Sequence, residues 1–569
     1  MSGISIRRRA EVAMRFGAPL VAAAALVGCG GGSTGSSIES VASAVDSTEA
    51  ITGATVGGTT STTAIRLASV TANATPILTC DTAGIGSVKL VSDLPTLPTT
   101  TPPNDSSATI TSVTTGTTAT GVPYCLVKVL VPPAINIWVG LPTGGNWNGR
   151  LQSEGGGGYA GSVGIPTGSI GAGYVGVQTD TGHVGGSGTF GMLTPVPNGA
   201  PDVQLQTDFA FRSEHEMAVI GKQLAQAFYG EGPRYSYWNG CSTGGRQGMR
   251  MAQQFPGDYH GILAGAPAFH WDRFQAYQIW PQVAMRLEAG GPVAGAKQTL
   301  ATNAAVAACD AIDGVIDSVI GDPRQCTYNP VNDATITRAS CTSTDNSCLT
   351  PGEASAIQKI WGGARNTSGK LLWPGVERGA ALNGLGGASP FAIAVAQPRF
   401  WVYFDPTWDW TTLTYSNYEA FFKKTMQMVN PMMASESPDL SAFRNGGGKL
   451  VTWQGWADQL IMPQGSTMYY DAVTNFMGGG YAQTQQFFRH FMAPAVGHCG
   501  GGNGPQPQDL LQSVVDWVEQ GTAPERITAS RTLAGGAVQT RPLCPYPAFA
   551  KYTGSGSTDD AANFVCAAP

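Results

Sequence analysis

Charge and histidine are both scarce in this chain. Charged residues make up only 12% of its 569 residues, and histidine occurs six times. Acidic residues outnumber basic ones, so the formal net charge is −6 and no polycationic face is expected. We therefore do not expect nucleic acid as a partner. The 42% share of hydrophobic residues is typical of a globular protein, and the length indicates more than one domain.

The apolar run near the N-terminus, residues 18–27, is too short to span a bilayer. It follows three arginines, so residues 1–29 are predicted to be a signal peptide. Its end, Leu-Val-Gly-Cys, resembles a bacterial lipobox with Cys29 as the lipidated residue, and the alternative is an ordinary cleavage site with an incidental cysteine. Residues 30–75 are rich in Ser, Thr, Ala and Gly and are predicted to be a flexible linker.

We therefore expect an exported bacterial lipoprotein of the outer membrane, the periplasm or the cell exterior. It would contact the membrane only through a lipid anchor at Cys29.

Cysteine use supports export. The chain has 11 cysteines, and removing Cys29 leaves an even number that suits disulfides in an oxidising compartment. Zinc is a weaker alternative, because paired Cys-x-x-Cys spacing is missing. Nearness in the sequence suggests four disulfides, and two cysteines remain as a fifth pair. The four are Cys80 with Cys125, Cys309 with Cys326, Cys341 with Cys348 and Cys544 with Cys566, and the remainder is Cys241 with Cys499.

Strand and helix patterns alternate along the chain. Residues 150–154 and 174–178 are predicted strands, and apolar residues at three- and four-residue steps predict a helix over 209–229. A further strand at 235–238 turns sharply at Gly-Cys-Ser-Thr-Gly and continues as a helix to about residue 254. Strand, tight turn and helix are the context of a nucleophile elbow, in which flanking glycines let the strained backbone expose the serine Oγ. We predict Ser242 as the nucleophile, and the alternative is a glycine-rich turn without chemistry.

The general base should follow the serine in sequence. In an α/β-hydrolase the order is nucleophile, acid, histidine. His498 lies in a glycine-rich loop between a predicted strand at 487–492 and a predicted helix at 510–519, whereas His490 falls within that strand. We therefore predict His498 as the base. If Ser242 and His498 lie within about 3 Å, their neighbouring cysteines come into disulfide range.

The acid that orients the histidine should follow a strand. Residues 449–453 are a predicted strand, and Asp458 comes just after its end. We predict that its carboxylate accepts from the imidazole Nδ1 and stabilises the imidazolium. Asp471 is a competitor, but it falls in a helical stretch, and a helix N-cap is the alternative role for Asp458.

An oxyanion hole needs two backbone donors. One is the N–H of Thr243, the residue after the nucleophile. The other is predicted at Gly157 or Gly158, in a run of four glycines directly after a strand. A flexible turn is the alternative for this run.

Five motifs carry a family resemblance. They are Gly-Gly-Gly-Gly-Tyr-Ala-Gly at 155–161, Gly-Cys-Ser-Thr-Gly-Gly-Arg-Gln at 240–247, Gly-Ala-Pro at 265–267, Gly-Trp-Ala-Asp at 455–458 and Gly-His-Cys at 497–499. From about residue 80 to 569 the chain resembles the tannase and feruloyl esterase family, which includes the bacterial mono(2-hydroxyethyl) terephthalate hydrolase. The resemblance implies a Cys-Ser, Asp, His-Cys arrangement with the two cysteines bridged.

The resemblance also implies an α/β-hydrolase core with a large inserted lid domain. We place the core at 76–269 and 448–569, and the lid at 270–447. About 190 residues separate the Gly-Ala-Pro motif from Asp458, which is far more than one strand–helix unit needs.

An acidic turn around Gly314 lies inside this predicted lid. Carboxylates converging on a tight loop suit Ca²⁺, although the spacing is not that of an EF-hand, and a solvated turn is the alternative. The resemblance implies a structural calcium ion, distant from the ester and braced by the loop between Cys309 and Cys326. Its implied ligands are the side chains of Asp310, Asp313 and Asp317 and the carbonyl oxygens of Val315 and Val319.

The substrate signal lies in a dense aromatic stretch between residues 391 and 422. Such rings, Trp401 among them, stack on planar acyl groups, with lid core as the alternative. Arg399 could hold a substrate carboxylate bidentately. In terephthalate-monoester hydrolases the residue three after the acid is aromatic, whereas here it is Ile461, which argues against that narrow substrate.

Together these features predict an exported, calcium-containing serine carboxylesterase. Its partner would be a small-molecule ester of an aromatic acid such as ferulate, gallate or terephthalate, and no organic cofactor is required. The alternatives are a serine peptidase on the same core and a non-catalytic surface-binding protein.

Overall fold

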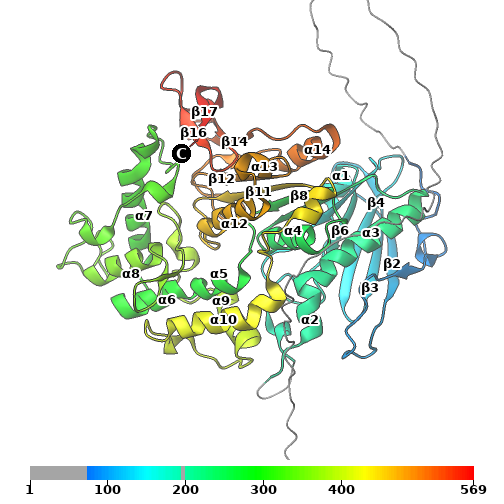
Figure 1. Ribbon diagram of the computed structural model, residues 1–569, viewed down its shortest axis with the longest axis horizontal. Helices are drawn as coiled ribbons and strands as arrows, with labels where there is room; N and C mark the ends of the chain where they lie inside the picture. Colours follow the sequence, from blue (N-terminus) through cyan, green and yellow to red (C-terminus); the bar gives the residue numbers. More distant parts are fainter. Residues whose placement is uncertain (1–73, 194–198, 569) are drawn as a thin grey trace, which may run out of the picture. The chain divides into compact units, whose positions relative to one another are not determined.

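The computed structural model describes residues 74–193 and 199–568 (Figure 1). The predicted signal peptide, Cys29 and nearly all of the predicted linker lie outside the described residues. Within the described ranges, no helix combines the length and the apolar character needed to cross a membrane.

A ten-stranded mixed sheet forms the centre of the fold. Its first five strands pair antiparallel, and the strands from β6 to β12 run parallel to one another. In spatial order the strands are β1 (Leu90–Val91), β2 (Ser107–Thr117), β3 (Pro123–Val131), β4 (Ile135–Pro142), β6 (Val175–Thr179), β5 (Arg150–Glu154), β7 (Tyr235–Cys241), β8 (Gly261–Gly265), β11 (Lys449–Gly455) and β12 (Phe488–Ala493).

Helices cover both faces of the parallel part. Because side chains alternate along a strand, Ile262 and Leu450 face one side and Leu263 and Val451 the other. The first side packs against α3 (Ser213–Tyr229), α4 (Thr243–Gln254) and α12 (Pro463–Met477). The second packs against α14 (Leu510–Gln520). The helix predicted over 209–229 is α3, preceded by one wide turn at Asp208–Arg212.

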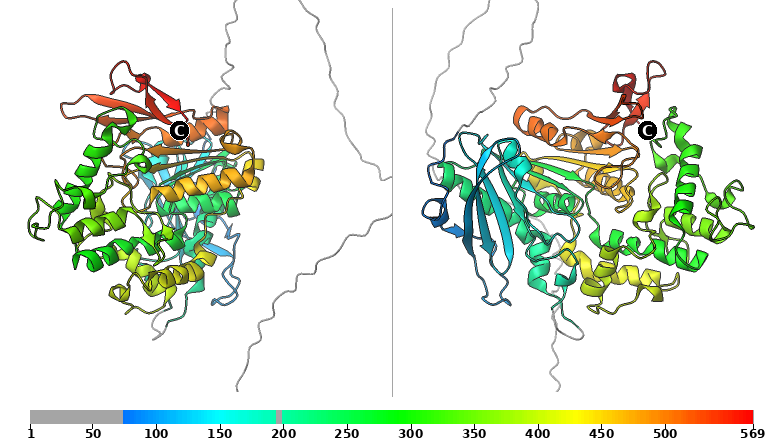
Figure 2. Two further views of the ribbon diagram at one scale, coloured as in Figure 1. Left: turned by 60° about the vertical axis from the view of Figure 1, so that its left-hand side comes forward. Right: turned by 180° about the vertical axis from the view of Figure 1, so that it is seen from behind.

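A large helical insertion leaves the sheet between β8 and β11, which are neighbours in the sheet. Its elements are α5 (Trp271–Gln278), α6 (Trp280–Ala284), α7 (Gly295–Cys309), α8 (Pro351–Trp361), β9 (Ala364–Arg365), β10 (Leu371–Trp373), α9 (Ala392–Gln397), α10 (Tyr418–Met433) and α11 (Ser441–Asn445). Figures 1 and 2 show helices α5 to α10 gathered at the end of the sheet opposite β2 and β3. They share a core that includes Trp280, Tyr418 and Phe421 and that continues to Tyr159 and Phe209 of the α/β part.

The C-terminal segment adds two small antiparallel sheets. One contains β13 (Gln506–Pro507), β14 (Ile527–Thr532) and β15 (Val538–Leu543), and the other contains β16 (Phe549–Tyr552) and β17 (Phe564–Ala567). The disulfide between Cys544 and Cys566 ties the second sheet to the end of β15.

The described residues form five disulfides, which are the four pairs that nearness in the sequence suggests and the remaining pair, Cys241 with Cys499. Four span between 7 and 45 residues, whereas Cys241 and Cys499 are 258 residues apart. This long-range disulfide joins the end of β7 to the loop after β12. It therefore lies at the carboxyl edge of the parallel strands, where α/β folds place their ligands.

Candidate active site

Ser242 occupies a sharp turn between β7 and α4. Its backbone has φ 64° and ψ −123°, a conformation that costs a non-glycine residue about 1–3 kcal/mol. The turn closes because Gly240 has no side chain: a Cβ atom there would lie 2.6 Å from the Gly244 backbone. The Ser242 N–H donates to Gly265 O at 3.0 Å, which fixes the turn to the next strand. The strained turn matches the elbow expected from the sequence.

Asp458 and His498 form a hydrogen-bonded pair. His498 Nδ1 lies 2.8 Å from Asp458 Oδ2, and Asp458 is fully buried. The carboxylate also accepts from Gln454 Nε2 at 2.6 Å, and from the N–H groups of Leu460 and Ile461 at 2.9 Å each. An acceptor so placed holds the proton on Nδ1 and leaves Nε2 free as a base. Asp471, the competitor, lies on α12 and accepts from Tyr481 instead.

The Cys241–Cys499 disulfide, with Cα atoms 6.0 Å apart, holds the serine and histidine loops together. Ser242 and His498 line one pocket of about 440 Å³, within the range of small-molecule sites. The hydrogen bonds of the described residues do not include one between Ser242 Oγ and His498. Such bonds in ligand-free enzymes commonly tighten only when substrate is present.

The glycine run after β5 forms one wall of this pocket. Gly155 N–H donates to Asn239 O at 2.9 Å, and Gly156 N–H donates to Gln247 Oε1 at 3.0 Å. In the described part of the chain, the N–H groups of Gly157, Gly158 and Thr243 donate to no acceptor. These three groups are therefore the ones available to a substrate oxygen. They are also the donors expected from the sequence.

Two contacts hold the glycine run against the elbow. Thr243 Oγ1 donates to Gly158 O at 2.6 Å. A Cβ atom at Gly155 would lie 2.6 Å from Gly244 Cα, so only glycine permits this approach.

Apart from Phe391, the first ring of the predicted aromatic stretch, the rest of the pocket comes from residues that the sequence did not single out for this role. Helix α5 contributes Trp271, Phe274, Gln275 and Gln278, and the insertion and the Asp458 loop add Phe391, Ile393 and Leu460. The position of α5, directly after β8 at the carboxyl edge of the sheet, is the signal that could have identified it.

Of Arg399, Trp401 and Ile461, the three residues that the sequence places on the substrate side, only Ile461 lines this pocket. Arg399 instead donates from Nε to Trp408 O at 3.0 Å. Trp401 is 2% exposed, donates to Gly188 O and packs on Tyr159. The aromatic stretch thus mainly fills the core of the insertion, so the prediction that Arg399 and Trp401 line the substrate site is wrong for this structure.

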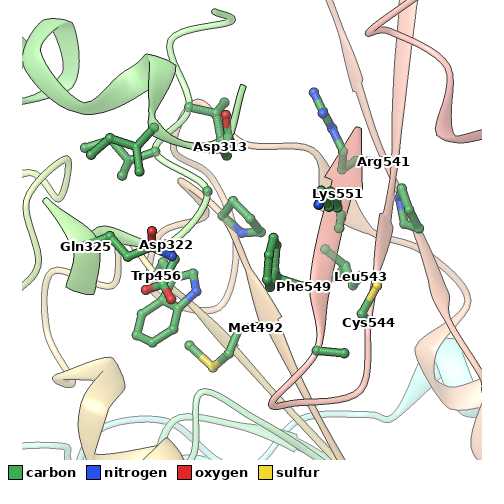
Figure 3. Close-up of a pocket in the computed structure, with 18 of the residues that line it drawn as sticks. Asp313, Asp322, Gln325, Trp456, Met492, Arg541, Leu543, Cys544, Phe549 and Lys551 are labelled. Atoms are coloured by element: carbon green, nitrogen blue, oxygen red, sulfur yellow. The ribbon is translucent and has the colours of Figure 1, made fainter. Parts of the chain in front are cut away.

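The acidic turn lies elsewhere, beside a second pocket of about 220 Å³. Figure 3 shows Asp313 and Arg541 at this pocket, and none of Ser242, Asp458 and His498 lines it. Arg541 Nη2 donates to Asp317 Oδ2 at 2.5 Å.

Several features of the turn bear on a cation. Asp310 accepts from the N–H groups of Asp317, Ser318 and Val319. Burial, together with the Asp317 and Asp310 carboxylates, raises the pKa of Asp313 to about 6. Among the described residues, the carbonyl oxygens of Val315 and Val319 accept no hydrogen bond. Three carboxylates and two free carbonyl oxygens on one loop are a donor set that fits Ca²⁺.

The carboxylates of the turn do not all approach one another within 4.8 Å. In the described ranges, the group of three residues that meets this spacing is Cys341, Asp345 and Cys348. Its two cysteines are joined in a disulfide and so cannot act as thiolate ligands.

Comparison with known proteins identifies the family. The family model described as "Tannase and feruloyl esterase" matches residues 119–567. A probable feruloyl esterase of Arthroderma benhamiae is 37% identical over 448 residues, which cover 76% of this chain and 82% of that protein. Feruloyl esterase B of Aspergillus niger is 30% identical over 490 residues, covering 81% and 90%. The crystal structure of feruloyl esterase B from Aspergillus oryzae superposes with a TM-score of 0.71 at 28% identity, covering 81% of this chain and 97% of that one.

These matches extend over both parts of the sheet and the insertion between them. The chain belongs to the tannase and feruloyl esterase family, and it is a carboxylic ester hydrolase with an α/β-hydrolase fold.

Proposed function

We propose that this protein is a serine esterase that hydrolyses esters of aromatic carboxylic acids of the feruloyl, galloyl or terephthaloyl type. One observation carries the proposal: His498, which is hydrogen-bonded to Asp458, lines the same pocket as Ser242, and a disulfide between the adjoining cysteines joins the two loops. The names of the relatives support the acyl class, because they are feruloyl esterases.

In the first half of the reaction, His498 Nε2 takes the proton of Ser242 Oγ, which attacks the ester carbonyl carbon. Asp458 stabilises the imidazolium that forms. Thr243 N–H and a glycine N–H, from Gly157 or Gly158, hold the oxyanion. The C–O bond to the alcohol then breaks, and the alcohol leaves with the proton from His498.

In the second half, water replaces the alcohol. His498 takes a proton from the water, whose oxygen attacks the acyl carbon. The acid leaves as the bond to Ser242 Oγ breaks, and His498 returns the proton to the serine. No organic cofactor takes part in these steps.

The lining of the pocket supports an aromatic acyl group. Trp271, Phe274 and Phe391 offer ring surfaces, and Ile393 and Ile461 add aliphatic surface. Planar groups bind well between such side chains, since aromatic pairs gain about 0.5–1.5 kcal/mol beyond the area they bury.

The Ser242→Ala variant tests this mechanism. We expect it to fold like the wild type and to lose hydrolysis of methyl ferulate, methyl gallate and mono(2-hydroxyethyl) terephthalate. Activity near the wild-type level would exclude Ser242 as the nucleophile. A peptide amide is assayed beside these esters to test the serine peptidase alternative. Inactivity of the wild type on every ester would favour the alternative of a non-catalytic surface-binding protein.

Calcium is part of the proposal. The side chains of Asp310, Asp313 and Asp317 and the carbonyl oxygens of Val315 and Val319 would hold the ion, which would cross-link the loop between Cys309 and Cys326. Because this loop lies at the second pocket, we assign the ion a structural role.

We further propose that the protein is exported and anchored through Cys29, with cleavage before Cys29, lipid on its sulfur and residues 30–75 acting as a tether. The core would comprise residues 76–269 and 448–569, and residues 270–447 the lid. Five disulfides support an oxidising compartment.

A further inference from the structure

Two adjacent residues, Asp458 and Gln459, both bind His498. Asp458 accepts from the imidazole, whereas Gln459 holds the main chain: His498 N–H donates to Gln459 Oε1 at 3.1 Å. A backbone N–H only donates, so the amide atom that faces it is the oxygen. In the described part of the chain, this is the only hydrogen bond that the His498 main chain makes.

The loop that carries His498 needs such a contact because its own backbone is irregular. Between β12 and α14, Ala495 and Cys499 have φ values of 52° and 59°, which non-glycine residues rarely adopt. Three glycines with positive φ, residues 500–502, follow directly. His498 itself lies in neither a helix nor a strand. Its position is therefore set by the residues that it contacts.

Three contacts hold His498 in place. Asp458 binds the imidazole, the disulfide at Cys499 holds the next residue, and Gln459 holds the main-chain N–H. Loss of the third contact would let the main chain shift while the other two remain. Because His498 Nε2 must reach Ser242 Oγ, a displacement of about 1 Å can cost about 10²-fold in rate.

The insertion packs directly on the Gln459 side chain. The contact comes from the turn Leu382–Gly384, between β10 and α9. A Cβ atom at Gly384 would lie 2.7 Å from Gln459 Cγ and 3.3 Å from Gln459 Cβ. A turn at this distance limits the positions that the glutamine can adopt. The insertion is thus in contact with the residue that holds the His498 main chain.

We propose that Gln459 is a positioning residue for the base: the turn at Gly384 holds its side chain, which holds the His498 main chain and so aims Nε2 at Ser242 Oγ. The insertion then contributes to catalysis through His498 as well as by lining the substrate pocket. Gln459 does not line the pocket that contains Ser242, so it acts on turnover rather than on substrate affinity. This inference rests on the proposed function, in which His498 is the base.

Variants of Gln459 test the hydrogen bond. They are assayed on whichever of methyl ferulate, methyl gallate and mono(2-hydroxyethyl) terephthalate the wild type hydrolyses fastest. Gln459→Leu has no acceptor, so we expect kcat to fall at least about tenfold while KM changes less than about threefold. In Gln459→Glu a carboxylate oxygen still accepts from His498 N–H, and kcat should stay at least about fivefold above that of Gln459→Leu.

Variants of two glycines test the contact with the insertion and remove no hydrogen-bonding group. In Gly384→Ala the new Cβ atom must displace Gln459, and we expect kcat to fall at least about threefold. Gly387→Ala is the matched control, since a Cβ atom there would meet nothing closer than 3.4 Å apart from its chain neighbours. Adding Gly384→Ala to Gln459→Leu should lower kcat little further, because the hydrogen bond that it disturbs is already missing.

The outcomes separate this inference from the proposed function. If the wild type hydrolyses none of the three esters, or if His498→Ala turns them over like the wild type, the proposed function fails. If the wild type is active and His498→Ala is not, but Gln459→Leu keeps the wild-type kcat, the role of Gln459 is overturned while the esterase proposal stands. A lower melting temperature with unchanged kcat counts as the same result, because it shows a role in stability alone.

The glycine variants decide the part played by the insertion. Equal kcat values in Gly384→Ala and Gly387→Ala would overturn it, as would full additivity of Gly384→Ala with Gln459→Leu. Gly384→Ala also keeps the proposal testable if Gln459→Leu does not fold, since an unchanged kcat in Gly384→Ala then contradicts it.

Discussion

Gln247 is hydrogen-bonded to Gly156, and the bond links the elbow helix to the glycine run. Gln247 Oε1 accepts from Gly156 N–H at 3.0 Å, and Gln247 Nε2 donates to the fully buried Glu214. Burial raises the pKa of Glu214 to about 7. Gln247 thus positions the run whose next two residues, Gly157 and Gly158, line the pocket.

The Gln247→Leu variant should therefore lose turnover more than substrate affinity. We expect kcat to fall at least about tenfold, with a smaller change in KM, because a misplaced oxyanion donor acts mainly on the transition state. Gln253→Leu is the matched control, since Gln253 lies on the same helix but donates to Ser435 O. Equal losses in both variants would refute a positioning role for Gln247.

The variant in which Cys241 and Cys499 are both replaced by alanine should have a kcat at least about tenfold below that of the wild type. Both proteins are assayed well below the melting temperature. The disulfide aligns the Ser242 and His498 loops, and misalignment of about 1 Å can cost 10²-fold. Replacing Cys341 and Cys348 is the control, because that bridge closes only a short loop away from the pocket. Unchanged kinetics in the first variant would mean that the bridge does not align the dyad.

His490 should make the protein sensitive to acid. It is 1% exposed on β12, and burial lowers its pKa to about 3 from an ordinary value of 6.5. As pH falls below 6.5, the unfolded chain takes up a proton at this residue that the folded chain does not, so stability is lost progressively down to about pH 3.

Urea unfolding at pH 7 and pH 5 measures this effect. The free energy of unfolding contributed by His490 should fall by about 2 kcal/mol between the two pH values. In His490→Asn the difference between pH 7 and pH 5 should be smaller than in the wild type by about this amount. The same pH dependence in both proteins would show that His490 is not buried in its neutral form.

Calcium removal should destabilise the protein without changing its selectivity. We expect EDTA to lower the melting temperature and added Ca²⁺ to restore it, because an ion that binds only the folded state stabilises it. In Asp313→Asn, EDTA should lower the melting temperature less than in the wild type. Asp322→Asn is the control and should respond to EDTA like the wild type, because Asp322 is a nearby acidic residue that is not a predicted ligand. A wild-type melting temperature that does not respond to EDTA would argue against the ion.

The elements around the candidate site could be predicted from sequence because they obey local rules. The strand before Ser242 and the glycines around it force a tight elbow, and the structure has β7, the strained turn and α4 at these positions. The strands before Asp458 and His498 appear as β11 and β12. Pairing each cysteine with a near neighbour left Cys241 and Cys499, and the structure joins them.

The sequence suggested an aromatic stretch for the acyl side of the pocket, but not which of its residues line the cavity. Phe391 and Ile393 lie more than a hundred residues from α5 in sequence, and only packing of the insertion brings them to the same cavity. Trp401 is an aromatic residue of the kind that contacts such substrates, but it is buried against Tyr159, in the loop after β5. Aromatic composition alone does not distinguish a core side chain from a pocket side chain.

Covalent labelling tests the central claim most directly. The purified protein is treated with a fluorophosphonate that reacts with activated serines, and the labelled peptide is identified by mass spectrometry. The account predicts one adduct on Ser242, strongly reduced in His498→Ala, together with loss of esterase activity. An adduct on another residue, or full esterase activity in protein labelled at Ser242, would contradict it.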